Sequence, residues 1–255
     1  MNRFFRIILA ATLLLLTATA QAAISDGGDY IEEEGIAYPE GQSLSAMRRI
    51  AIMDAYRFLS ERVDDIHFSA NSTVRNLRDL DDVINTKVET VLRGARVMDV
   101  RREHDGSFHA VVRLYLHGNA NSLAGAVLGE TVEIEDFPPP KYTNMVAGTY
   151  SGLIIDCRGK NLSTAIAPVI KSADGTEIYA YKNVGYQTAV SNGVIGYSSS
   201  MDSGVERAGA SPLVVKAVSV SGGCDVVVSD DDADKILAAN RATMFLNNCA
   251  VVLVR

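Results

Sequence analysis

The sequence predicts an α+β protein made of two units, and three observations support this fold class. In the first half, apolar residues switch between strand and helix spacing in the order β-α-β-α-β-β. The second half ends with the run "CDVVVS", a helical pattern and the run "AVVLV", which is the order of a βαβ unit with parallel neighbouring strands. Between the halves lies "EDFPPPKY", whose three prolines exclude both helix and sheet.

The first unit begins with a predicted strand over residues 30–38. Ser43 is a suitable N-cap for an amphipathic helix over 45–63. The inward face of this helix carries small alanine side chains, which allow it to pack closely on a sheet. Alternating residues 66–74 predict a half-buried strand, and 79–92 predict a second helix with acids in its first turn.

A β-hairpin completes the first unit. Two alternating runs flank Asp105-Gly106, a preferred pair for a two-residue hairpin turn. Apolar residues on the second run share one face: Phe108, Ala110, Val112, Leu114 and Leu116. We assign residues 23–118 to this unit and 119–141 to a linker, with a short helix expected within 119–129.

Residues 142–255 form the predicted C-terminal α/β domain. A helix from Asp230 to about Leu246 follows Ser229, which with Asp232 forms a variant of the capping box. The other expected elements are a buried strand at 150–156, a hairpin at 167–171 and 177–181, a loop-rich segment at 182–200, strands within 211–220 and 224–229, and a last strand at 250–254.

The N-terminus has the pattern of a cleavable signal peptide over residues 1–22. Arg3 and Arg6 precede an apolar stretch too short for a comfortable membrane span, and Ala20 and Ala22 suit a signal peptidase that cuts between Ala22 and Ala23. An uncleaved membrane anchor is the alternative. We expect no transmembrane segment in the mature chain, no lipid anchor near the cleavage point, and a periplasmic or exported location with outer-membrane association as an option.

The charge of the chain argues against nucleic acid as a partner. The mature chain would keep 22 basic and 31 acidic residues, a net charge of −9, and such a surface repels a phosphate backbone on average.

One stretch juxtaposes groups that suggest catalysis, namely Asp156, Cys157 and Arg158 before Gly159. A phosphate-binding cysteine loop would need an arginine about six residues beyond the cysteine, and a Cys-His pair would need a histidine in the second half. The sequence has neither. We therefore expect the end of a strand followed by a turn.

The other polar candidates also have simpler explanations. The acids Asp230, Asp231, Asp232 and Asp234 lack the central glycine and distal glutamate of a calcium loop, so helix capping explains them. The four histidines, His67, His104, His109 and His117, are too scattered for a zinc site. The glycines of 118–129 lack a nucleotide fingerprint. We expect no catalytic, cofactor-binding or metal-ligating residues and no cofactor.

Export would place three cysteines in an oxidising compartment. If the strands that begin near Cys224 and Cys249 are parallel neighbours, a Cys224–Cys249 disulfide can form and Cys157 is the free thiol. Three buried, reduced cysteines are the alternative.

The first half also resembles a known group of proteins. Gly35, the segment "SLSAMRRIAIMDAYRFLSERV" and the hairpin entered through Gly94 to Val97 are similar to the N-terminal module of the flagellar T-ring protein FlgT. That module is shared with small outer-membrane lipoproteins of the Lpp family and with FlgP, and the likeness covers residues 30–117. Lipoprotein members carry a lipobox cysteine, which this chain lacks. The second half, with "YSGLIIDCRG" and "VVVSDDDADKI", resembles uncharacterised exported proteins.

The resemblance implies a non-catalytic, exported cell-envelope protein that acts as a structural or assembly component related to flagellar basal-body and outer-membrane proteins. Its partners would be envelope proteins, flagellar ring components or further copies of itself. The alternatives are a periplasmic ligand- or peptide-binding protein that uses exposed strand edges, and a hydrolase.

The signal peptide gives a direct test. We expect the protein from the exported fraction to begin at or near Ala23, because small residues occupy the positions that a signal peptidase recognises. Intact-mass analysis measures this, and a mass that includes residues 1–22 would refute cleavage.

Overall fold

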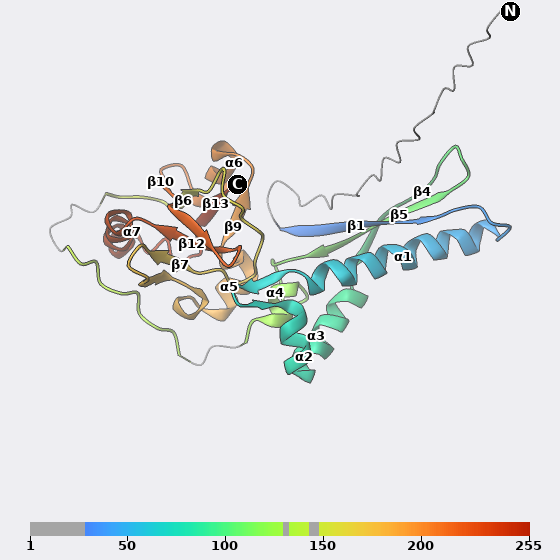
Figure 1. The fold of residues 1–255 in the computed structure, drawn as a ribbon, viewed down its shortest axis with the longest axis horizontal. Coiled ribbons are helices and arrows are strands. Elements are labelled where there is room, and N and C mark those ends of the chain that lie inside the picture. Colours follow the sequence, from blue (N-terminus) through green and yellow to red (C-terminus); the bar gives the residue numbers. More distant parts are fainter. Residues whose placement is uncertain (1–28, 130–132, 143–147) are drawn as a thin grey trace, which may run out of the picture.

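The computed structural model describes residues 29–129, 133–142 and 148–255, which form two α+β units packed side by side along the long axis of the molecule (Figure 1). The predicted signal peptide and its cleavage point between Ala22 and Ala23 lie outside these residues. Within the described ranges, no helix has the length and hydropathy that a membrane span requires.

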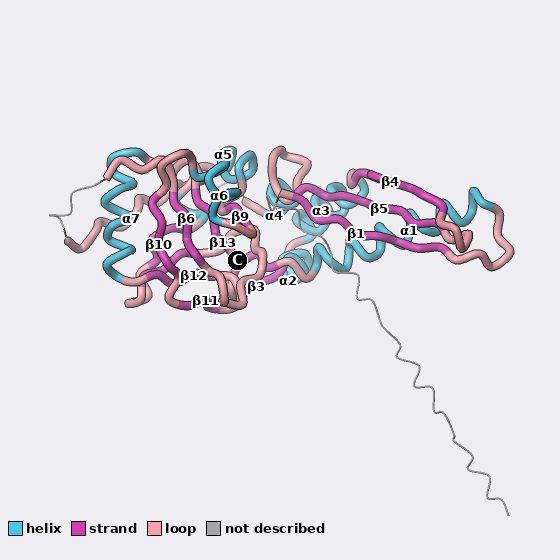
Figure 2. The backbone as a smooth tube through the Cα atoms, turned by 90° about the horizontal axis from the view of Figure 1, so that it is seen from above, coloured by secondary structure: helices cyan, strands magenta, loops and turns pink. Residues whose placement is uncertain are grey.

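The N-terminal unit is a three-stranded antiparallel sheet covered on one face by a long helix. The strand order is β1 (Tyr30–Ala37), β5 (Phe108–Tyr115), β4 (Arg96–Arg102). Helix α1 (Leu44–Asp64) runs along β1 and β5, as Figures 1 and 2 show. The predicted helix and hairpin are therefore present.

Helix α1 lies unusually close to the sheet because small residues face each other. Ala51 and Ala55 are fully buried, and a Cβ placed on Gly35 of β1 would lie 2.1 Å from the backbone nitrogen of Ala55. The helix begins as predicted at Ser43, whose side chain accepts a hydrogen bond from the N–H of Ala46.

Two details of this unit differ from the prediction. The expected strand at 66–74 is a small ribbon of β2 (His67–Ser69) and β3 (Ser72–Thr73), because Thr73 caps a further helix, α2 (Val74–Leu80). The expected second helix is α3 (Asp82–Arg93), which begins one residue after its cap, Asp81.

The hairpin turn also differs from the predicted two-residue form. Its loop has three residues, because the Glu103 N–H bonds to the Ser107 carbonyl and Gly106 adopts a left-handed φ of 86°. The Asp105 carboxylate accepts hydrogen bonds from the Ser107 N–H and hydroxyl, which stabilises this wider turn.

The C-terminal unit contains two four-stranded sheets. The first is all parallel, in the order β10 (Leu213–Lys216), β6 (Leu153–Asp156), β13 (Val251–Val254), β9 (Gly196–Ser198). The second is mixed, in the order β11 (Ser219–Ser221), β12 (Asp225–Val228), β7 (Ile170–Ser172), β8 (Glu177–Tyr179). The accompanying helices are η1 (Tyr181–Asn183), α5 (Tyr186–Asn192), α6 (Met201–Ala208) and α7 (Asp230–Thr243).

The predicted parallel pairing of the last two strands is wrong. Strand, helix and strand follow in the expected order, but β12 pairs with β7 and β11, whereas β13 lies between β6 and β9 of the other sheet. All four residues of β13 are buried, so this strand takes a central position with a partner on each side. The predicted Cys224–Cys249 disulfide is not formed, and Cys157, Cys224 and Cys249 are free and buried.

The segment predicted as a linker packs against both units. Helix α4 (Leu123–Val127) is entirely buried and lies against α3 and α5, which confirms the short helix. Farther on, the ring of Phe137 stacks on Tyr179 at 6.3 Å, and the Lys141 N–H donates to the buried Asp234 carboxylate. The two units thus share one continuous hydrophobic core.

The close contact between α1 and β1 can be tested by adding one methyl group. We expect Gly35→Ala to lower the free energy of unfolding by about 3 kcal/mol, because its Cβ would overlap the backbone of α1. Urea unfolding measures the change. Gly94→Ala is the matched control, because its Cβ would lie 3.4 Å or more from its neighbours, so an equal loss in both variants would contradict this role of Gly35.

Candidate functional site at the junction of the two units

The Asp156–Gly159 stretch has the geometry of a strand end. Arg158 donates two hydrogen bonds to the Asp156 carboxylate, at 2.9 and 2.8 Å, and these bonds lower the pKa of Asp156 to about 2. Burial raises the pKa of the Cys157 thiol to about 12, so the thiol stays protonated and a poor nucleophile. Gly159 forms the turn with a φ of 75°.

The acids at the start of α7 lie where capping predicts them. The Ser229 hydroxyl accepts from the Asp232 N–H and donates to its carboxylate. Asp230 accepts a hydrogen bond from the Asp174 N–H, at 3.1 Å. In the parts of the chain that the structure describes, no three His, Cys, Asp or Glu side chains gather as a metal site would require.

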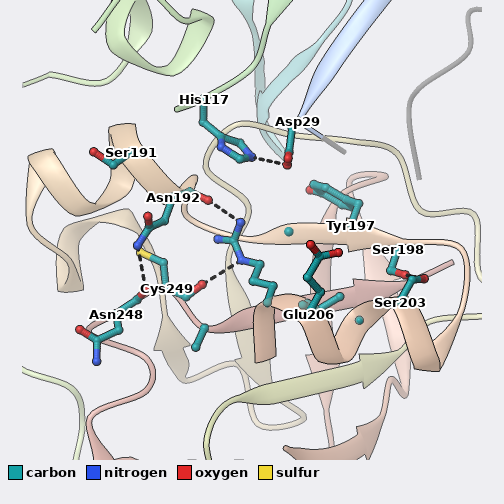
Figure 3. Close-up of a pocket in the computed structure, with 15 residues that line it drawn as sticks. Asp29, His117, Ser191, Asn192, Tyr197, Ser198, Ser203, Glu206, Asn248 and Cys249 are labelled. Atoms are coloured by element: carbon teal, nitrogen blue, oxygen red, sulfur yellow. Dashed lines mark hydrogen bonds and ion pairs between the residues drawn. The ribbon is translucent and has the colours of Figure 1, made fainter. Parts of the chain in front are cut away.

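The strongest candidate for a functional site is a cleft of about 470 Å³ between the units (Figure 3). Its N-terminal wall carries Asp29 and His117, and its other wall comes from α5, β9, α6 and the loop before β13. The polar groups on that wall include Asn192, Tyr197, Ser198, Ser203, Glu206, Arg207 and Asn248. The sequence had drawn attention to two of the lining residues for other reasons: His117 as one of four scattered histidines, and Cys249 as a candidate for a disulfide.

Asp29 and His117 are hydrogen-bonded across the end of the β1–β5 ladder. His117 Nε2 lies 3.1 Å from Asp29 Oδ1, and this hydrogen bond lowers the pKa of Asp29 (Figure 3). The imidazole packs against Gly193 of the other unit, where a Cβ would lie 2.7 Å from its Cδ2. The Gly118 N–H, which donates to the Val190 carbonyl at 2.8 Å, also joins the two units.

Arg207 holds the C-terminal wall together. Its guanidinium donates to the carbonyls of Asn192, Gly193 and Cys249, so it caps the end of α5 and fixes the loop before β13. Its stem crosses Gly196, where a Cβ would lie 2.6 Å from Cδ. Desolvation by these surroundings lowers the pKa of Arg207 from its ordinary value.

The nucleophilic groups of the cleft are not activated. The hydroxyls of Ser198 and Ser200 bond to that of Ser203 at 2.5 and 2.7 Å, and burial raises the pKa of the Cys249 thiol. Among the described residues, these hydroxyls bond to one another and to the Ser200 carbonyl, whereas His117 pairs with Asp29. The arrangement can bind a polar molecule through these hydroxyls and the neighbouring amides.

Comparison with known proteins divides the chain in the same two parts. Residues 16–115 match the model of the LPP20 lipoprotein family, and residues 152–255 match the second domain of Treponema pallidum Tp0624. No curated protein matches the chain. The N-terminal unit is thus similar to the LPP20 lipoprotein module, and neither match is to FlgT or FlgP.

The buried thiols give a prediction for alkaline pH. Burial raises the pKa of Cys157 and Cys224 to about 12, whereas an unfolded cysteine has a pKa of about 8.5. Above pH ~9 the unfolded chain loses these protons and the folded chain keeps them, so stability is full below the unfolded pKa and falls as pH rises. We expect each thiol to contribute a loss of about 1 kcal/mol per pH unit between pH ~9 and ~10.

Urea unfolding at a series of pH values measures this slope. The variant with Cys157→Ala and Cys224→Ala has lower stability throughout, but its slope above pH ~9 should be shallower than that of the wild type. An unchanged slope would show that these thiols do not cause the loss.

Proposed function

We propose that this protein is a non-catalytic component of the cell envelope that binds another protein through the free edge of β4. The observation that carries the proposal is the exposure of this strand. Six of its seven residues are exposed, and its backbone pairs with β5 on one side only. The predicted signal peptide and the match to the LPP20 lipoprotein family support a location in the envelope.

The register shows which backbone groups are free on β4. In an antiparallel pair, residues alternate between those bonded to the neighbouring strand and those whose N–H and C=O point away. Glu103 bonds to Ser107, and Arg102 is paired with Phe108. The backbone groups of Arg102 and Val100 therefore point outward, where an added strand could bond to them.

The opposite edge of the sheet is partly closed. By the same alternation the N–H of Ile36 on β1 points outward, and it donates to the Asp54 carboxylate of α1 at 3.3 Å. Arg57 holds that carboxylate in place with a 2.8 Å ion pair. A side chain that occupies an edge donor discourages strand addition, so β4 is the more available edge.

Charge favours a partner strand that is acidic. Arg96 and Arg102 of β4 have no carboxylate partner among the described residues, whereas Arg101 is neutralised by Glu34, Asp99 and Glu103. An antiparallel β4–β4 pairing of two copies that bonds the outward groups of Val100 to those of Arg102 would place the two Arg101 side chains directly opposite each other. Like charges directly opposite destabilise a sheet, so we favour a different protein over self-association.

The flagellar role is the finer version of this proposal. It rests on the resemblance of residues 30–117 to the FlgT and FlgP module, and it identifies the acidic strand with a component of a flagellar ring. The cleft of about 470 Å³ favours a second candidate, a periplasmic ligand-binding protein, because it offers polar groups from both units.

Site-specific photo-crosslinking in the producing cell tests the β4 edge. A photoreactive residue at Met98, which is 46% exposed on β4, should give a discrete adduct with another envelope protein. Arg102→Pro should abolish this adduct, because proline removes an outward N–H without removing a bond to β5. Arg102→Lys is the matched control and should retain it, because lysine keeps both the N–H and the positive charge.

The identity of the adduct separates the versions of the proposal. Mass spectrometry that finds a flagellar ring protein would support the flagellar role, and any other envelope protein would support the general one. A photoreactive residue at the exposed Met53 on α1 controls for chance contacts. An adduct that survives Arg102→Pro, or one that contains only this chain, would reject the proposal.

A further inference from the structure

We propose that a second cavity at the junction binds a phosphate group, a site separate from both the β4 edge and the larger cleft. The cavity has a volume of about 280 Å³ and lies where the end of α1 and β2 meet the C-terminal unit. Its polar lining consists of Arg62, Asp65, His67, Ser163, Thr164 and Arg255.

The three basic side chains come from three different elements. Arg62 lies in the last turn of α1, His67 begins β2, and Arg255 follows β13. The backbone fixes their positions, since the His67 carbonyl accepts from the Ile166 N–H at 2.9 Å and the Arg255 N–H donates to Ser198 at 3.0 Å. The cavity is therefore built by the fold, with both units contributing to it.

Two of these side chains have buried nitrogen atoms that lack a partner. Arg62 Nε and His67 Nδ1 are buried and make no hydrogen bond within the described structure. A buried polar group without a partner costs free energy, so a ligand or water that satisfies it is expected. Arg255 makes one side-chain hydrogen bond, from Nη1 to the Thr164 hydroxyl at 3.1 Å.

The local charge of the cavity is positive, although the whole chain carries a net charge of −7. None of Arg62, His67 and Arg255 forms an ion pair with a carboxylate in the part of the chain described. Asp65 is the one acid among the lining residues, and it is 70% exposed and pairs with Arg75 at 3.3 Å. Burial raises the pKa of the nearby Glu33 and the charge of Arg62 lowers it, so an anion would find positive charge that is only partly offset.

A phosphate group fits this set of donors better than a carboxylate does. Two guanidinium groups offer planar, paired N–H donors that match phosphate oxygens, and Ser163 and Thr164 add hydroxyls. A phosphomonoester carries close to two negative charges near neutral pH and presents three acceptor oxygens, whereas the phosphodiester of a lipid headgroup carries one charge and presents two, and either can satisfy several donors at once. The cavity also has room for a substituent, so the phosphate can belong to a soluble phosphomonoester or to a lipid headgroup.

Calorimetric titration of residues 23–255 tests the site with three probes: inorganic phosphate, glycerol phosphate, and vesicles of phosphatidylglycerol compared with phosphatidylcholine. We expect Arg62→Gln to weaken binding at least tenfold. Asp65→Asn should strengthen it several-fold, because it removes the one acid of the lining. Arg57→Gln, on the same helix but outside the cavity, should bind as the wild type does.

The melting temperature without phosphate separates binding from folding. Because Arg62 Nε has no partner, Arg62→Gln should melt at or above the wild-type temperature, whereas a merely structural arginine would lower it. Arg62→Gln should also leave the Met98 adduct unchanged, so this site can fail independently of the β4 edge.

Each binding result either supports or overturns the phosphate site. Binding of either soluble probe that depends on Arg62 supports the site, and binding of phosphatidylglycerol vesicles alone with the same dependence assigns the phosphate to a lipid. No binding of any probe, or equal binding by Arg62→Gln and Arg57→Gln, would show that the cavity holds water only and overturn the proposal.

Discussion

The close contact between α1 and the sheet is the constraint on which the rest of the structure depends. A helix can lie this near a strand only where neither surface has a side chain larger than a methyl group at the crossing, and Gly35 with Ala51 and Ala55 meets that condition. The contact fixes the direction of a 21-residue helix. Its far end then delivers Val63 and Ile66 to the core that both units share, so the junction depends on packing that begins at the other end of the unit.

The junction between the units is packed with buried side chains, as the interior of each unit is. Helix α4 fills it with buried residues, and His67 bridges to Ala165 as a strand neighbour. The Arg207 guanidinium donates to three backbone carbonyls and so connects the end of α5 to the loop before β13. Cavities at such a junction are preformed. Their side chains lose conformational entropy during folding, so less entropy is lost when a ligand binds.

The sequence was most informative where structure is decided locally. Helix α1, the β4–β5 hairpin and the cap at Ser229 follow from spacing and from single residues, and all three are present. The strand neighbours of β12 were predicted wrongly. Whether β12 pairs with β7, which contains Ile170, or with β13, which contains Val251, depends on contacts between residues far apart in the sequence. The two junction cavities were missed for the same reason: Arg62, His67 and Arg255 converge only in three dimensions.

An acidic protein can bind acidic partners when its positive charge is local. At physiological ionic strength the Debye length is about 8 Å, so a partner at a binding surface responds mainly to the nearest charges and little to the net charge of −7. Arg96 and Arg102 on the β4 edge and Arg62 and Arg255 in the junction cavity are four such charges without a carboxylate partner in the described structure. Elsewhere most arginines are neutralised, as Arg57 and Arg101 are, so the unpaired ones mark the surfaces where an anionic group gains the most.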